Sequence, residues 1–217
     1  PGIFARAMES MRRLSLDVRA TTPRFNLDVA TCLTRTNKSR VTALHDYLRS
    51  SVEFDAYQFL YPRGNAEVAQ EKDVSAEEYA AALEHAHARD LKLHHNPILA
   101  AVNRVARAGI LRFLKSDEHP WPCLAGRKFI SITERGILQP CEILGQLKPD
   151  YDSDLGRLRD FDFDVSKALA SPKARAVTDF IRDTKCRCSF ECAANCNVVF
   201  APTQALRVVK TLTTGTA

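Results

Sequence analysis

Four cysteines crowd into eleven residues near the end of this 217-residue chain, in the segment CRCSFECAANC at positions 186–196. Thiols this close together act as metal ligands or as disulfide partners. The chain has no apolar block typical of a secretory signal, so we expect a reducing, cytoplasmic location. In that compartment clustered cysteines are metal ligands before they are disulfides.

Two further cysteines flank a predicted β-hairpin. The segment KFISITE alternates as a strand does, RG supplies a turn, and ILQPCEIL returns as the second strand. A hairpin with a cysteine before it and another within its return strand brings two sulfurs near one point. The candidate metal ligands are therefore Cys123, Cys141, Cys186, Cys188, Cys192 and Cys196. Such thiolates suit zinc or an iron–sulfur cluster, and the absence of paired CxxC motifs speaks against an ordinary zinc ribbon.

The spacing of apolar residues predicts the secondary structure of the first 90 residues. Helices are predicted over 4–14, 38–51 and 75–90, and strands over 24–33 and 54–64, so that helices and strands alternate. This alternation indicates parallel βα units in an α/β fold. Cys32 falls inside a predicted buried strand, so we expect it in the core rather than at a metal.

Polar residues follow the two predicted strands, where parallel βα units place functional groups. Asn37 and Arg63 lie at these two strand ends, where they are candidate functional residues. The alternatives are that Asn37 caps the helix that follows it and that Arg63 is simply exposed after a turn. Ser75 and Glu78 have the spacing of a capping box.

A long amphipathic helix is predicted over 95–116, and the prolines of HPWPC at 119–123 end it. We place a domain boundary there, which gives domains over 1–118 and 119–217. The second domain contains the hairpin, then a polar loop and helical segments that run into the cysteine-rich segment. We expect the small polar residues of the last segment, RVVKTLTTGTA, to be frayed.

The segments PCLAGRKFISITERGILQPCEILGQL and KCRCSFECAANCNVVF resemble the C-terminal auxiliary-cluster domain, of the SPASM/twitch class, of radical S-adenosylmethionine enzymes. The element Cys-x9-15-Gly-x4-Cys that opens that domain is matched by Cys123, Gly136 and Cys141. The upstream segments LDVATCLTRTN and FDAYQFLYPRGNAE resemble the later βα units of the family's barrel. The resemblance implies an α/β chain: the C-terminal part of a partial (β/α) barrel, followed by a small Cys-rich α+β auxiliary-cluster domain with a β-hairpin.

This resemblance also implies a chemistry. The complete enzyme would be an oxidoreductase or maturase that cleaves S-adenosylmethionine reductively, takes electrons from a ferredoxin or flavodoxin, and modifies a substrate such as a peptide, a protein or a cofactor precursor. Arg63 would contact the carboxylate or ribose of S-adenosylmethionine, and Asn37 would also touch it. One auxiliary 4Fe–4S cluster would be held by Cys123, Cys141 and two or three of Cys186, Cys188 and Cys192, with Cys196 as the spectator; the alternative is a second cluster with an open iron.

The family's CxxxCxxC motif, which binds the cluster that cleaves S-adenosylmethionine, does not occur in this sequence. We therefore expect an N-terminally incomplete chain that does not cleave S-adenosylmethionine by itself. The alternative function is a zinc-stabilised structural or binding module without catalysis.

Composition limits other functions. The net charge of +5 is dispersed among acidic residues, which disfavours nucleic acid as a partner. No run of about 18 apolar residues is present, so no membrane-spanning helix is expected. The histidines at 85, 87, 94 and 95 show no frame of carboxylates around them and are interpreted as surface residues.

Overall fold

The computed structural model describes residues 2–22, 24–90 and 96–214, and the chain divides into two compact units. Unit 1 comprises Pro1–Pro62 and Val68–Pro97, and unit 2 comprises Arg63–Glu67 and Ile98–Ala217. The division between units thus precedes the long helix that ends at Ser116, whereas the sequence analysis places a domain boundary after residue 118. The helix belongs to unit 2 because the ring of Trp121, which follows it, packs directly on Gly109 within it.

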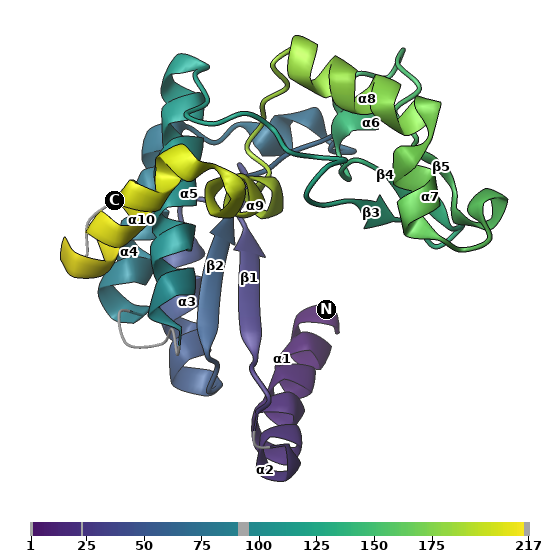
Figure 1. The fold of residues 1–217 in the computed structure, drawn as a ribbon. Helices are drawn as coiled ribbons and strands as arrows, with labels where there is room; N and C mark the ends of the chain where they lie inside the picture. Colours follow the sequence, from purple (N-terminus) through teal and green to yellow (C-terminus); the bar gives the residue numbers. More distant parts are fainter. Residues whose placement is uncertain (1, 23, 91–95, 215–217) are drawn as a thin grey trace. The chain divides into compact units, whose positions relative to one another are not determined.

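Unit 1 contains a two-stranded parallel sheet with helices (Figure 1). Its elements are α1 Ile3–Arg13, the π-helical η1 Leu14–Val18, α2 Arg19–Thr21, β1 Asp28–Cys32, α3 Val41–Ser51, β2 Ala56–Leu60, the 3-10 helix η2 Ala69–Lys72 and α4 Ala76–Asp90. β1 pairs with β2 in parallel, with Asp28 opposite Ala56 and Cys32 opposite Leu60. The predicted α/β class and parallel βα unit are confirmed. In the part of the chain that the structure describes, this sheet has two strands.

The core of unit 1 forms where α3 and α4 pack close to the sheet. Phe59 of β2 and Tyr79 of α4 are almost fully buried, and the Tyr79 hydroxyl donates to the carbonyl of Phe59 at 3.3 Å. The predicted capping box at the start of α4 is confirmed: the Glu78 amide donates to Ser75 Oγ at 3.1 Å, and the Ser75 amide donates to Glu78 Oε2 at 2.8 Å. Two otherwise unpaired backbone donors are thereby satisfied at the helix start.

The expectation that Cys32 is a core residue is wrong. Successive side chains of a strand point to opposite faces. In β1 the buried face carries Val29, so Cys32, three positions later, lies on the opposite face and is exposed. The apolar run predicts a largely buried strand, but among the five residues of β1 only Val29 is buried.

Unit 2 begins with a helix and then adds a small antiparallel sheet and further helices (Figure 1). Its elements are α5 Pro97–Ser116, β3 Ser131–Ile132, β4 Ile137–Gln139, α6 Leu144–Leu147, β5 Gly156–Arg157, the 3-10 helix η3 Leu158–Phe161, α7 Val165–Ala170, α8 Pro172–Asp183, α9 Glu191–Phe200 and α10 Pro202–Thr214. No described helix is long and apolar enough to cross a membrane.

The predicted hairpin is confirmed. β3 and β4 pair antiparallel, and Gly136 takes a φ of +71° in the turn between them. That conformation is favourable for glycine and strained for other residues. A third strand, β5, pairs with β4 and was not predicted.

Residues 207–214 differ from the expectation of a frayed last segment, and residues 215–217 lie outside the described residues. α10 is a helix of 13 residues that runs to Thr214, and two of its polar side chains, Gln204 and Thr211, are buried. Gln204 also donates to the carbonyl of Pro120 at 3.3 Å. A helix held by buried side chains does not fray as an exposed polar tail does.

Candidate metal centre

Four of the six predicted ligands form one group, which we call the four-sulfur group: Cys123, Cys141, Cys186 and Cys188. All six pairs of these sulfurs lie within range of each other's electrostatic influence. Two come from the ends of the hairpin segment, and two come from the loop between α8 and α9. Each is largely buried, within or against the hydrophobic core of unit 2.

Backbone amides point at three of these sulfurs in a repeated pattern. The amide of Ala125 bonds the sulfur of Cys123, that of Ile143 bonds Cys141, and that of Phe190 bonds Cys188. In every case the donor lies two residues after the cysteine. Such donors stabilise a thiolate over a thiol, and they tune the electron density of a metal-bound sulfur.

Cys123 and Cys186 are linked by a hydrogen bond between their side chains. This bond, together with the Ala125 amide and the charge of Arg127, lowers the pKa of Cys123 to about 7 despite its burial. The same bond strongly raises the pKa of Cys186, because its proton is held between the two sulfurs. The pair therefore gives up its first proton near neutral pH and retains its second.

The other two thiols of the group are disfavoured as isolated anions. Burial raises the pKa of Cys188 to about 12 against the effect of the Phe190 amide, and burial also raises the pKa of Cys141. The neighbouring sulfurs raise both values further by repulsion. Four adjacent thiolates are thus unstable without a cation among them, and a bound metal supplies that charge.

Cys192 and Cys196 lie on α9, and of the four grouped sulfurs only Cys123 acts on the pKa of either, that of Cys196. Burial raises the pKa of Cys192, and the charges that act on it come from Arg63, Glu142 and Glu191. Burial raises the pKa of Cys196 as well, and its sulfur lies 3.7 Å from the carbonyl of Lys128. The spectator role of Cys196 remains a prediction, and the structure adds Cys192 as a second candidate for that role.

Arg63 lies beside the cysteine-rich segment. Its Nη1 is 2.6 Å from Glu191 Oε2, and its guanidinium carbon lies 4.5 Å from the centre of the Phe190 ring. Glu191 is about 10% exposed, so this ion pair is shielded from solvent. The Arg63 charge also favours the thiolate forms of Cys188 and Cys192. The predicted contact of Arg63 with S-adenosylmethionine remains a prediction.

Asn37 closes the turn after β1. Its Nδ2 donates to the carbonyl of Cys32 at 2.9 Å, and its Oδ1 accepts from the amide of Thr34 at 2.8 Å. The helix that follows begins at Val41 with Arg40 in the cap position, so Asn37 does not cap it. Its contact with a cofactor likewise remains a prediction.

Two positioning residues of the four-sulfur group were missed by the sequence analysis. His119 Nε2 lies 2.9 Å from the carbonyl of Cys188, and burial lowers the pKa of this histidine, which favours the neutral ring as a donor. Asn197 is 2% exposed and accepts from the amide of Leu124 at 2.9 Å. Both contacts fix loops that carry the ligands, and neither leaves a signal in cysteine spacing.

A second group of ligand-type side chains lies in unit 1. One ligand atom each from His45, Asp46 and His85 lie within 4.8 Å of one another. His85 Nε2 is 3.0 Å from Asp46 Oδ1, so His85 is half-buried in an ion-pair network rather than an isolated surface residue. Arg89 binds the same carboxylate oxygen at 2.6 Å, which puts a cation where a metal ion would bind. The predicted surface residues His94 and His95 lie outside the described residues.

The spacing of the sulfurs bears on the kind of metal. Four thiolates on one zinc ion lie about 3.8 Å apart, given zinc–sulfur bonds of about 2.3 Å. In the described residues no three cysteine sulfurs lie within 4.8 Å of one another. Ligands of different irons in a cluster are held farther apart by the cluster itself. The donor set, soft thiolates with amide donors, fits an iron–sulfur cluster.

Comparison of the chain with protein-family models, with curated proteins and with solved structures returned no match.

Proposed function

We propose that the four-sulfur group binds one auxiliary 4Fe–4S cluster and that the chain is part of a radical S-adenosylmethionine enzyme. The observation that supports this most is the position of Cys123, Cys141, Cys186 and Cys188, all within or against one hydrophobic core and near enough to act on one another's pKa. The amides of Ala125, Ile143 and Phe190 act to lower the pKa of three of these thiols. They thereby favour anionic sulfur, which is the state that iron requires.

Unit 1 supports the proposal less specifically. In the resembling family, parallel βα units form a partial barrel, and β1, α3, β2 and α4 are two such units in sequence. We propose that they are the later units of that barrel. Their strand ends would then face S-adenosylmethionine, with Asn37 shaping the first turn. Arg63 would act mainly on the cysteine-rich segment through Glu191.

The residues around the proposed cluster would have different roles. Cys123, Cys141, Cys186 and Cys188 would hold the cluster, whose role is to bind substrate or to carry electrons. The cations Arg63 and Arg127 would offset the negative charge of the thiolates. The Ala125, Ile143 and Phe190 amides would stabilise the charge on sulfur and His119 would fix the Cys188 loop. Electrons would come from a ferredoxin or flavodoxin of a reducing, cytoplasmic compartment, and a peptide, a protein or a cofactor precursor would be modified.

One observation favours a second candidate, a zinc-stabilised binding module. The Cys123 and Cys186 side chains interact directly, and two thiolates that bind one zinc ion would lie equally close together. Metal identity separates the two functions. The chain would be purified without oxygen, reconstituted with iron and sulfide, and analysed for iron, zinc and visible absorption.

The proposal predicts a brown protein with about four irons per chain. A colourless protein that retains one tightly bound zinc ion after the same treatment would overturn it in favour of the binding module.

A further inference from the structure

The four-sulfur group forms part of the wall of a cavity in unit 2. The cavity has a volume of about 680 Å³, and both Cys123 and Cys186 line it. Sites for small organic molecules usually have volumes of about 300–1,000 Å³. Part of the wall is apolar, formed by Pro120, Trp121 and Ile181. The cavity is thus large enough for a metabolite and gives it access to two of the proposed ligand cysteines.

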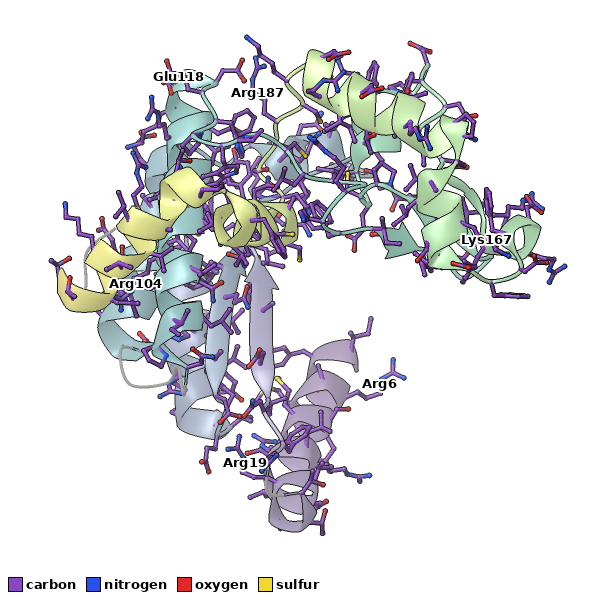
Figure 2. The ribbon with its side chains drawn as sticks, viewed as in Figure 1. Arg6, Arg19, Arg104, Glu118, Lys167 and Arg187 are labelled. Atoms are coloured by element: carbon purple, nitrogen blue, oxygen red, sulfur yellow. The ribbon has the colours of Figure 1, made fainter. Side chains whose placement is uncertain are left out.

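Positive charge dominates the rest of the wall. Five cations line the cavity against two carboxylates: Arg112, Arg127, Arg182, Lys185 and Arg187 against Asp117 and Glu118. Figure 2 labels Glu118 and Arg187, one charged residue of each sign from this wall.

Most of these charges are already matched. Arg112 binds Glu118 at 2.5 Å, Arg187 binds Asp117, and Arg182 binds carboxylates of its own helix. Arg127 and Lys185 are different, because no carboxylate in the described part of the chain pairs with either.

These two cations are exposed, and the charge of Arg127 acts on the sulfur of Cys123. Arg127 Nη2 lies 3.5 Å from the carbonyl of Cys123, and Lys185 directly precedes Cys186. Two positive charges without a carboxylate partner, beside an apolar wall, favour a ligand with two negative charges, because the low-dielectric wall strengthens the attraction.

We propose that this cavity binds a small organic dianion, a phosphomonoester or a dicarboxylate, between Arg127 and Lys185. The apolar body of the ligand would lie against Pro120, Trp121 and Ile181. That the dianion is the substrate or effector of the cluster rests on the function proposed above. That it binds in the cavity rests on the cations and the wall alone.

The chain contains a natural reporter for this site. Trp121 is the only tryptophan of the sequence, it is about 5% exposed, and it lines the cavity. Its fluorescence would be recorded while the intact chain is titrated with phenyl phosphate, with phthalate and, as an uncharged control, with benzyl alcohol. We expect a saturable change with at least one dianion and none with benzyl alcohol.

Charge-neutralising variants locate the binding. Arg127→Gln and Lys185→Gln should each weaken binding by about tenfold, the value of one charge-assisted hydrogen bond. Lys167→Gln is the matched control: Lys167 lies on α7, pairs with Asp162 and does not line the cavity (Figure 2). It removes the same charge from unit 2 and should leave binding unchanged. Circular dichroism of each variant would verify that the fold is kept.

The result separates this inference from the proposed function. Binding that needs Arg127 and Lys185 supports the cavity assignment, whether or not iron is bound, and a preference for phenyl phosphate or for phthalate identifies the headgroup. If a protein that takes up no cluster binds the dianion in this way, the dianion site is supported and the proposed function as a radical enzyme is refuted. A brown, iron-loaded protein that binds neither dianion, or loses binding equally in Lys167→Gln, would overturn the dianion site and leave the cluster intact.

Discussion

At the scale of residues, the cysteines of this chain are chemically unequal although their spacing makes them look alike. Cys123 has a pKa of about 7, because Cys186 and the Ala125 amide donate to its sulfur. Cys188 has a pKa of about 12, because burial outweighs the Phe190 amide. The difference arises from which sulfurs receive hydrogen bonds and from how deeply each is buried.

This inequality predicts an order of alkylation in the metal-free, reduced chain. At pH 7 about half of Cys123 is thiolate, the reactive form, whereas Cys188 is almost entirely protonated. Brief treatment with iodoacetamide should therefore modify Cys123 well before Cys188, as followed by peptide mass spectrometry. The rate at Cys123 should be half-maximal near pH 7 and should level off above about pH 8. At Cys188 the rate should continue to rise toward pH 12.

The same treatment in urea is the control, since the two rates should converge once the fold is lost. Faster modification of Cys188 than of Cys123 in the folded chain would contradict the assignment of the low pKa to Cys123.

At the scale of elements, α5 and the loop after it form a close contact. A Cβ atom added to Gly109 would lie 2.0 Å from Cη2 of Trp121. Helix propensity alone predicts that Gly109→Ala stabilises α5 by about 1 kcal/mol. The overlap predicts the opposite, a loss of about 1–3 kcal/mol in the free energy of unfolding. Urea denaturation of the two proteins would measure the sign.

A double-mutant cycle supplies the control. In a chain that already carries Trp121→Ala, the overlap is gone, and Gly109→Ala should be neutral or stabilising. If Gly109→Ala stabilised the chain that retains Trp121, the packing of this loop on α5 would be refuted.

The elements also show where sequence reasoning succeeds. The hairpin was predictable because residues 128–134 alternate in polarity and are followed by Gly136, which can take positive φ. The start of α4 was predictable because Ser75 and Glu78 have capping-box spacing. β5 was not, because two residues are too few for a period. The helix α9, which carries Cys192 and Cys196, was not predicted either, because its residues are buried on several sides and show no amphipathic stripe.

The candidate metal centre was also predictable from the sequence only in part. The six candidate cysteines were visible in the sequence, but the grouping of four of them was not. A gap of 44 residues between Cys141 and Cys186 holds no information on which sulfurs meet. The amide donors and the cavity depend on backbone geometry, which spacing does not encode.

At the scale of the whole molecule, the sequence contains the candidate ligands of the auxiliary cluster but lacks the motif with which the resembling family cleaves S-adenosylmethionine. Cys32 is the only cysteine before Cys123, so the chain has no CxxxCxxC motif. We predict that the reconstituted chain, supplied with S-adenosylmethionine and dithionite, forms no 5′-deoxyadenosine by liquid chromatography. A buffer sample containing free iron and sulfide would correct for background cleavage. Catalytic amounts of 5′-deoxyadenosine above that background would contradict the prediction.

The central claim, that four particular cysteines hold one cluster, is tested most directly by the iron content of reconstituted variants. We predict about four irons per chain in the parent, in Cys192→Ala and in Cys196→Ala, and a severe loss in Cys141→Ala and Cys188→Ala. Cys32→Ala, in unit 1, is the control for nonspecific iron at thiols and should behave as the parent. Two results would contradict the claim that the four-sulfur group is the cluster site. In one, Cys192→Ala loses as much iron as Cys188→Ala. In the other, the parent and all variants fail to retain iron.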